Sequence, residues 1–99
     1  MKDLPMQFAI LNHDKPGTLD LRMEVRETHL AYLREVGDKL MTAGPILDAD
    51  SKTPIGSLLI IEADDLEAAR TFAANDPYAK AGLFASSTVW PWRLVFPEK

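Results

Sequence analysis

The sequence contains no cysteine, and this absence removes several kinds of chemistry at once. Disulfide bonds, thiolate zinc sites and cysteine nucleophiles are excluded, and a chain without cysteine is compatible with a reducing cytoplasm. Long hydrophobic runs are also missing, because no stretch approaches the ~20 apolar residues of a membrane-spanning helix. The first residues lack the layout of a signal peptide. We therefore expect a cytoplasmic protein with no membrane partner.

Positive charge is scarce, since 11 Lys and Arg residues stand against 15 Asp and Glu residues, a formal net charge of −4. Nucleic acid is held by basic surfaces, so the acidic total argues against a nucleic-acid partner. The two histidines, His13 and His29, lie in unrelated segments, and no ligand spacing typical of a metal site recurs. No Gly-rich phosphate-binding motif is present either. We expect neither a metal nor a cofactor.

The 99 residues, of which 46% are hydrophobic, are enough for one domain over 1–99. Periodicity and turn residues predict four strands, at 6–12, 40–47, 57–63 and 85–96. The first helix is expected from a Thr18 cap to about Leu40, and the second within 63–76, with Asp64 as its N-cap. A short extra helical turn is expected at 76–82 and a polar loop at 48–56.

This β-α-β-β-α-β order predicts an α+β, ferredoxin-like fold, an antiparallel four-stranded sheet with both helices on one face. The third and fourth predicted strands are apolar on both faces. Their side chains are Leu58 and Ile60 against Leu59 and Ile61, and Val89 and Leu94 against Trp90, Trp92, Val95 and Phe96. Such strands favour a homodimer that packs sheet against sheet. A monomer with an exposed apolar sheet face is the alternative.

Polar residues interrupt the apolar stripe of the first predicted helix. Steps of three and four residues back from Leu40 reach Val36, Leu33, His29, Arg26 and Arg22. The stripe therefore predicts a helix that buries its C-terminal half and lines a polar cavity with its N-terminal half. A rotated helix is the alternative, in which Leu19, Met23, Leu30 and Leu33 face the core and the arginines face water.

The second predicted helix directs its inward face toward Asp76, just past its end. Asp76 is expected to cap the short turn that follows, and one of its oxygens can also bind an imidazole while the other caps. A carboxylate at one nitrogen of His29 would fix the tautomer and leave the second nitrogen as a base. A lone histidine such as His29 is also common as a hydrogen-bonded structural residue.

Four segments carry a resemblance to a known family: "KPGTLDLRMEVRETHLAYL", "LMTAGPILD", "PIGSLLIIEADDLEAARTFAANDPYAKAGLF" and "PWRLVF". Together they resemble the YCII-related family from Met6 to Phe96. The resemblance implies the dimeric α+β barrel form of the ferredoxin-like fold, with a pocket between helices and sheet. It also implies a catalytic pair, His29 and Asp76. Relatives include a dehydrochlorinase of a chlorinated hydroxyhydroquinone, and the wider superfamily includes muconolactone isomerases.

These observations favour a cofactor-free enzyme of the isomerase, lyase or dehydrochlorinase type, acting on a small anionic or phenolic compound. We expect His29 to remove a proton and Asp76 to orient its imidazole. Arg22 or Arg26 would hold an anionic oxygen, and Ser57 would add a hydrogen bond. The same groups would equally serve a non-catalytic small-ligand-binding module, and an accessory dimerisation module is a third possibility.

Overall fold

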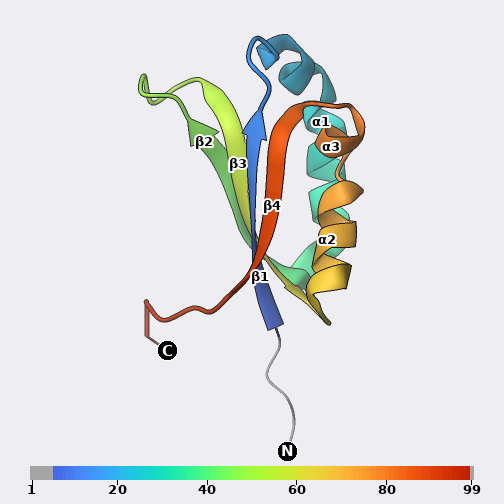
Figure 1. Ribbon diagram of the computed structural model, residues 1–99, viewed down its shortest axis with the longest axis vertical. Coiled ribbons are helices and arrows are strands. Elements are labelled where there is room, and N and C mark those ends of the chain that lie inside the picture. Colours follow the sequence, from blue (N-terminus) through green and yellow to red (C-terminus); the bar gives the residue numbers. More distant parts are fainter. Residues whose placement is uncertain (1–5, 99) are drawn as a thin grey trace, which may run out of the picture.

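The computed structural model describes residues 6–98, which form a four-stranded antiparallel sheet with the helices on one face (Figure 1). The strands are β1 (Met6–Asp14), β2 (Leu40–Leu47), β3 (Pro54–Ala63) and β4 (Phe84–Trp92), in the spatial order β2-β3-β1-β4. The helices are α1 (Leu19–Val36), α2 (Leu66–Ala74) and α3 (Pro77–Lys80), with a 3₁₀ turn, η1, at Gly37–Lys39. The predicted ferredoxin-like βαββαβ arrangement is confirmed.

The first helix is shorter than predicted, and three strands have different bounds. β1 extends through Asp14, two residues further than predicted. Gly37 ends α1 because its backbone φ is 66°, a left-handed conformation that glycine adopts without strain. The chain then turns through η1 and enters β2 at Leu40. The polar loop is shorter than expected, since β3 already begins at Pro54. β4 ends at Trp92, where its ladder with β1 stops, so the expected strand residues 93–96 lie outside the sheet.

The cap of α2 is one residue later than predicted. Asp65, not Asp64, is the N-cap, and its side chain accepts a hydrogen bond from the Ala68 amide at 2.8 Å. Asp65 has the extended backbone that an N-cap adopts, which aims its carboxylate at the third amide of the helix. Thr18 does occupy the N-cap position of α1, but its hydroxyl donates to the Lys15 carbonyl instead of capping.

The core lies between the sheet and the helices. Its buried members are Phe8 and Ile10 of β1, Leu59 and Ile61 of β3, Leu33 of α1, and Ala69 and Ala73 of α2. The alternate residues of each strand face the helices, as the period of two requires. Burying one large apolar side chain of this kind stabilises the fold by about 1.5–3 kcal/mol. The two alanines let α2 approach the sheet closely.

The orientation of α1 decides between the two predicted faces. Arg22, His29 and Leu33 are its buried residues, whereas Leu19 and Met23 are exposed. The interrupted stripe is therefore the inward face, and the rotated alternative is wrong. None of the helices in residues 6–98 is long and apolar enough to cross a membrane.

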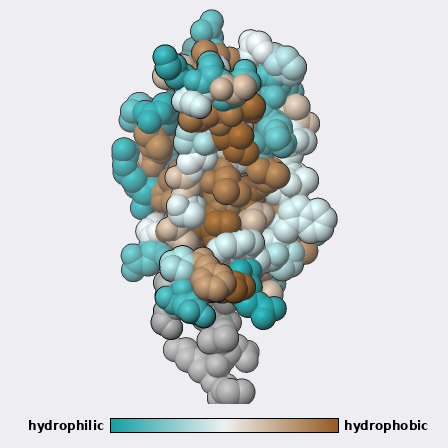
Figure 2. All heavy atoms as spheres, turned by 90° about the vertical axis from the view of Figure 1, so that its left-hand side faces the viewer, coloured by the Kyte–Doolittle hydropathy of each residue, from teal (hydrophilic) through white to brown (hydrophobic). Residues whose placement is uncertain are grey.

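The opposite face of the sheet carries no helix. Figure 2 shows this face as a hydrophobic band that runs along the sheet. Leu58 of β3 and Trp90 and Trp92 of β4 alternate with the residues that face the core, and Leu58 and Trp90 are 43% and 63% exposed. Sheet faces of this kind are normally covered in soluble proteins.

Candidate functional site

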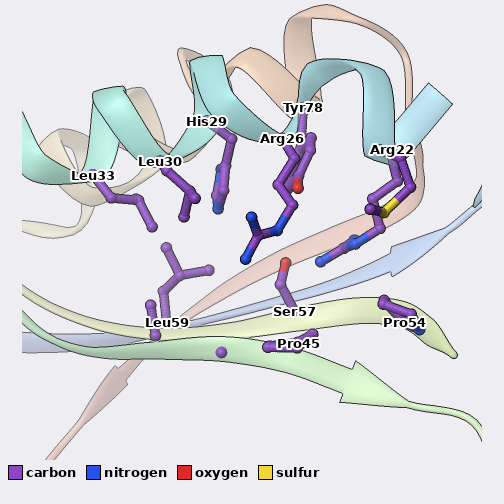
Figure 3. A pocket seen from close by; sticks show the side chains of 13 residues that line it. Arg22, Arg26, His29, Leu30, Leu33, Pro45, Pro54, Ser57, Leu59 and Tyr78 are labelled. Carbon is purple, nitrogen blue, oxygen red and sulfur yellow. The ribbon is translucent and has the colours of Figure 1, made fainter. Parts of the chain in front are cut away.

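A cavity of about 240 Å³ lies between α1 and strands β2 and β3, with Tyr78 of α3 in its wall (Figure 3). Its polar lining comes from Arg22, Arg26, His29, Ser57 and Tyr78. The apolar lining includes Leu30, Leu33, Ala43, Pro45 and Leu59. An apolar concave wall with a few convergent polar groups is typical of a small-molecule site. The volume is below the ~300–1,000 Å³ of pockets for drug-sized ligands, so it suits a ligand of about one ring.

His29 and Asp76 meet inside the fold, although 46 residues of chain separate them. The His29 Nδ1 and Asp76 Oδ1 atoms are 2.9 Å apart, and both side chains are more than nine-tenths buried. The third turn of α1 presents the imidazole, and the start of α3 presents the carboxylate. Figure 3 shows the imidazole pointing from α1 into the cavity. The sequence prediction that these two residues lie together is confirmed.

A single oxygen of Asp76 makes both of its predicted contacts. Oδ1 accepts from the Tyr78 amide at 2.9 Å, which caps α3, and the same atom contacts the His29 ring. The expectation of one oxygen for each role is therefore wrong. The turn formed by Pro77 at the first helical position brings the Tyr78 amide to the carboxylate, so the cap holds Oδ1 in place for the imidazole.

Arg22 is bound by protein groups rather than left free for a ligand. Its Nη1 atom lies 3.1 and 2.9 Å from the two carboxylate oxygens of Asp14, and its Nη2 atom donates to the Gly56 carbonyl at 3.1 Å. Both side chains of the ion pair are only 6% exposed. Asp14 neutralises Arg22, so this pair adds no net charge to the cavity.

Arg26 is the arginine with its charge available. Its side chain is 52% exposed, and the one acidic group of residues 6–98 that pairs with it is the Glu27 carboxylate at 3.9 Å, which is itself 81% exposed. A pair with this distance and exposure contributes little. Figure 3 shows the Arg26 guanidinium reaching down toward the sheet, beside His29 and Ser57. Arg26 therefore lies at the mouth of the cavity and gives the cavity a positive charge that no buried carboxylate of residues 6–98 neutralises.

Ser57 lies on the floor of the cavity, where Figure 3 shows its hydroxyl directed at the helix layer. It is 3% exposed, and its Oγ accepts from Asn12 Nδ2 at 3.0 Å. Because this oxygen accepts from Asn12, the hydroxyl proton is free to point into the cavity. Ser57 thus presents a hydrogen-bond donor to whatever lies there.

Tyr78 stacks on the imidazole and also contacts an arginine. The His29 and Tyr78 ring centroids are 4.0 Å apart at an interplanar angle of 18°. The Arg22 guanidinium carbon lies 4.7 Å from the Tyr78 ring centroid, within the range of a cation–π contact. Burial raises the pKa of the Tyr78 phenol, and the neighbouring Arg22 and Arg26 offset part of that rise.

Sequence reasoning missed Asp14 and Asn12. A signal for the first two was present, since Phe8, Ile10, Asn12 and Asp14 follow a strict period of two along β1. Phe8 and Ile10 are apolar and indicate which face of the strand is buried. Asn12 and Asp14 continue the same alternation, so they belong to that buried face. Within residues 6–98, no three His, Cys, Asp or Glu side chains gather in a way that could hold a metal ion.

Taken together, the cavity combines a histidine held by a carboxylate, one available guanidinium, a serine donor and a phenol. Such a set can move a proton and stabilise a negatively charged oxygen next to it. The apolar wall lowers the local dielectric, which strengthens both effects.

Comparison with known proteins gives a consistent match. The family model of the YCII-related domain matches residues 6–93. An uncharacterised protein of Haemophilus influenzae is 40% identical over 98 residues, which covers 92% of this chain and 100% of the relative. The protein YciI of Escherichia coli is equally similar, at 40% identity over 98 residues with the same coverage.

Solved structures agree with the sequence relatives. The dehydrochlorinase TftG of Burkholderia phenoliruptrix, which acts on 5-chloro-2-hydroxyhydroquinone, superposes with a TM-score of 0.83 at 41% identity. The match covers 89% of this chain and 94% of TftG, whose structure contains 2,5-dihydroxybenzoquinone. The cofactor-independent oxygenase SnoaB of Streptomyces nogalater has a TM-score of 0.61 at 15% identity, over 96% of this chain and 100% of its own. The latter shows a shared fold alone.

Proposed function

The chain belongs to the YCII-related domain family, and from this premise we propose that it is a small-molecule enzyme with cofactor-free acid–base chemistry. In this proposal His29 is the base, Asp76 orients it, and the substrate is a small anionic or phenolic ring compound. The reaction is of the isomerase, lyase or dehydrochlorinase type. The contact between His29 Nδ1 and Asp76 Oδ1 at 2.9 Å, at the wall of a cavity, is the observation that carries the proposal.

The contact assigns a tautomer to the base. A carboxylate only accepts, so Nδ1 of His29 carries a proton and Nε2 keeps a free lone pair. Asp76 also stabilises the imidazolium that forms when Nε2 takes a proton. The stacked Tyr78 ring limits rotation of the imidazole, so the base needs little reorganisation before reaction.

The charge of the cavity supports an anionic or phenolic ligand. Arg22 and Asp14 cancel each other. In the part of the chain that the structure describes, Arg26 is then the cation of the cavity lining that can meet a carboxylate, phenolate or enolate oxygen. Guanidinium stays protonated at all ordinary pH values and offers a bidentate fork to such oxygens. Arg26 is therefore the better candidate of the two arginines predicted to bind substrate, and Arg22 becomes a supporting residue.

The size of the cavity and the relationship to TftG support a single-ring substrate. TftG acts on a chlorinated trihydroxybenzene and was found with a dihydroxyquinone bound, and it is 41% identical to this chain. In the proposed reaction His29 removes a proton from a hydroxyl group or an activated carbon. In an isomerisation, the His29 imidazolium returns this proton to another atom of the substrate. In an elimination, the electron pair left on the substrate expels a leaving group such as chloride. Arg26 and Ser57 stabilise the intermediate oxyanion.

We also propose that two copies pack through the helix-free face of the sheet. The exposed Leu58, Trp90 and Trp92 form an apolar surface that matches a second copy of itself about a twofold axis. Replacing Leu58 with lysine would bury a charge in such an interface. Light scattering coupled to size-exclusion chromatography should then report a dimer for the unmodified protein and a monomer for Leu58→Lys. A monomer in both cases would refute this arrangement.

The test of the activity compares the two histidines of the chain. A panel of chlorinated and hydroxylated quinols, beginning with 5-chloro-2-hydroxyhydroquinone, is assayed for chloride release and for changes in ultraviolet absorbance. His29→Ala should lower turnover by about a hundredfold or more, because it removes the base. His13→Ala is the matched control, since His13 lies on an exposed part of β1 and should leave turnover unchanged.

Two results would contradict the catalytic reading. Full turnover in His29→Ala would eliminate the proposed base. If the unmodified protein and His29→Ala both bind panel compounds tightly and neither turns them over, the result would instead support the non-catalytic binding module.

A further inference from the structure

Tyr78 occupies a position that packing alone does not explain. It is one of the largest fully enclosed side chains of the fold, at 2% exposure, yet it lines the cavity. Within residues 6–98 no hydrogen bond of the protein involves its hydroxyl, and this oxygen is not among the fully buried atoms without a partner, so it opens onto the cavity. Buried tyrosines usually bond their hydroxyl to the protein, whereas this hydroxyl is left to pair with whatever occupies the cavity.

The other tyrosine of the chain, the half-buried Tyr32, shows the contrast. Tyr32 of α1 donates its hydroxyl to the Phe72 carbonyl at 2.8 Å, and its ring stacks on Phe72 with centroids 5.0 Å apart. Tyr32 therefore ties α1 to α2 and has a complete structural role. Tyr78 has the same kind of stacked ring, on His29, but directs its hydroxyl into the cavity, toward the side where Ser57 lies (Figure 3).

We propose that Tyr78 is a further catalytic residue, whose hydroxyl donates a hydrogen bond to the substrate oxygen that gains negative charge when His29 removes a proton. This inference rests on the function proposed above. Together with Ser57 and Arg26, the phenol completes a set of three donors around that oxygen.

Three contacts hold the phenol in the position that this role needs. The ring lies against the His29 imidazole at 4.0 Å and near the Arg22 guanidinium at 4.7 Å. The backbone amide of Tyr78 is bound to Asp76 Oδ1 at 2.9 Å. A donor fixed in advance of the reaction stabilises developing charge without the cost of reorganisation.

The phenol also stays protonated in the range where histidine acts as a base. Burial raises its pKa, so Tyr78 is a neutral donor at neutral pH. The role therefore requires no proton transfer from Tyr78: the proton taken by His29 comes from the substrate, and the phenol O–H bond stays intact.

The test measures the affinity for 2,5-dihydroxybenzoquinone by absorbance titration. Tyr78→Phe keeps the stacked ring and removes the hydroxyl alone, so binding of the anionic quinone should weaken about tenfold or more. Tyr32→Phe removes an equivalent hydroxyl outside the cavity and should bind the quinone as the unmodified protein does. Thermal melts of both variants report whether they fold.

Each other outcome has a defined meaning. Weakened binding in His29→Ala together with unchanged binding in Tyr78→Phe would overturn the role of Tyr78 and leave the proposed function standing. Weakened binding in Tyr78→Leu but not in Tyr78→Phe would assign Tyr78 to stacking only, which also overturns the inference. If the unmodified protein fails to bind the quinone, the proposed phenolic ligand class is contradicted and the inference falls with it.

Discussion

The buried ion pair between Arg22 and Asp14 allows a quantitative prediction. Replacing Asp14 with asparagine keeps the shape of the side chain but removes the charge that compensates Arg22. The guanidinium would then stay enclosed, with 6% of its side chain exposed, and keep only uncharged partners: the Gly56 carbonyl, the new amide oxygen and the Tyr78 ring. The protein must either hold an uncompensated charge in its interior or rearrange α1 to release it.

The expected loss follows from two estimates that agree. Opposite charges about 4 Å apart attract by about 4 kcal/mol at an effective dielectric constant of about 20. Measured losses on removing one partner of a buried pair are about 3–5 kcal/mol. We therefore expect Asp14→Asn to lower the free energy of unfolding by about 3–5 kcal/mol, a large share of the ~5–15 kcal/mol of a typical domain.

Equilibrium unfolding in urea, followed by tryptophan fluorescence at fixed protein concentration, measures this loss. Combining Asp14→Asn with Arg22→Met should recover much of it, because no unpaired charge is left inside. Glu27→Gln is the matched control for an exposed pair and should change stability by less than about 1 kcal/mol. A loss below about 1 kcal/mol in Asp14→Asn would refute the view that this pair is buried and coupled.

Three further predictions concern single positions. Gly56→Ala should destabilise the protein severely, since its Cβ would overlap a backbone carbonyl of β1, whereas Gly44→Ala has open space and should melt like the unmodified protein. Asp65→Ala should cost about 1 kcal/mol in urea unfolding, and Asp64→Ala much less; the reverse order would contradict the observed cap. Burial raises the folded-state pKa of Tyr78 above its unfolded value of ~10, so its contribution is present below that pH and is lost as the pH rises. The alkaline fall of the melting temperature should therefore be shallower in Tyr78→Phe.

The order of the elements was predictable from the sequence, because strands and helices differ in the period of their apolar residues. For the inward face of α1 the same period left two alternatives, which the structure decides. Spacing of three and four residues placed His29 and Arg22 on the buried side, and the apolar run of β3 marked a central strand. The exact ends of the helices were harder to predict. Asp64 and Asp65 are adjacent acids with equal cap preference, and only the local backbone decides which one caps.

The roles of the two arginines were not predictable from spacing. Both Arg22 and Arg26 lie on the inward stripe, but only Arg22 comes within reach of Asp14, which depends on how β1 extends beyond Asn12. Pairing of that kind is a tertiary property. The hydroxyl of Tyr78 is similar, since its aromatic ring alone indicates core and its direction depends on the turn that precedes α3.

The single carboxylate oxygen that caps α3 and contacts His29 constrains how this protein can diverge. A substitution at Asp76 would remove the cap of α3 together with the contact that holds the proposed base, so we expect few changes to be tolerated there. The rim of the cavity, formed by Arg26 and Met23, has no such double role. Both residues are exposed and contribute little to the stability of the fold. New ligand preferences should therefore arise at the rim, in nature or in directed evolution, while the proposed proton-transfer pair, His29 and Asp76, stays fixed.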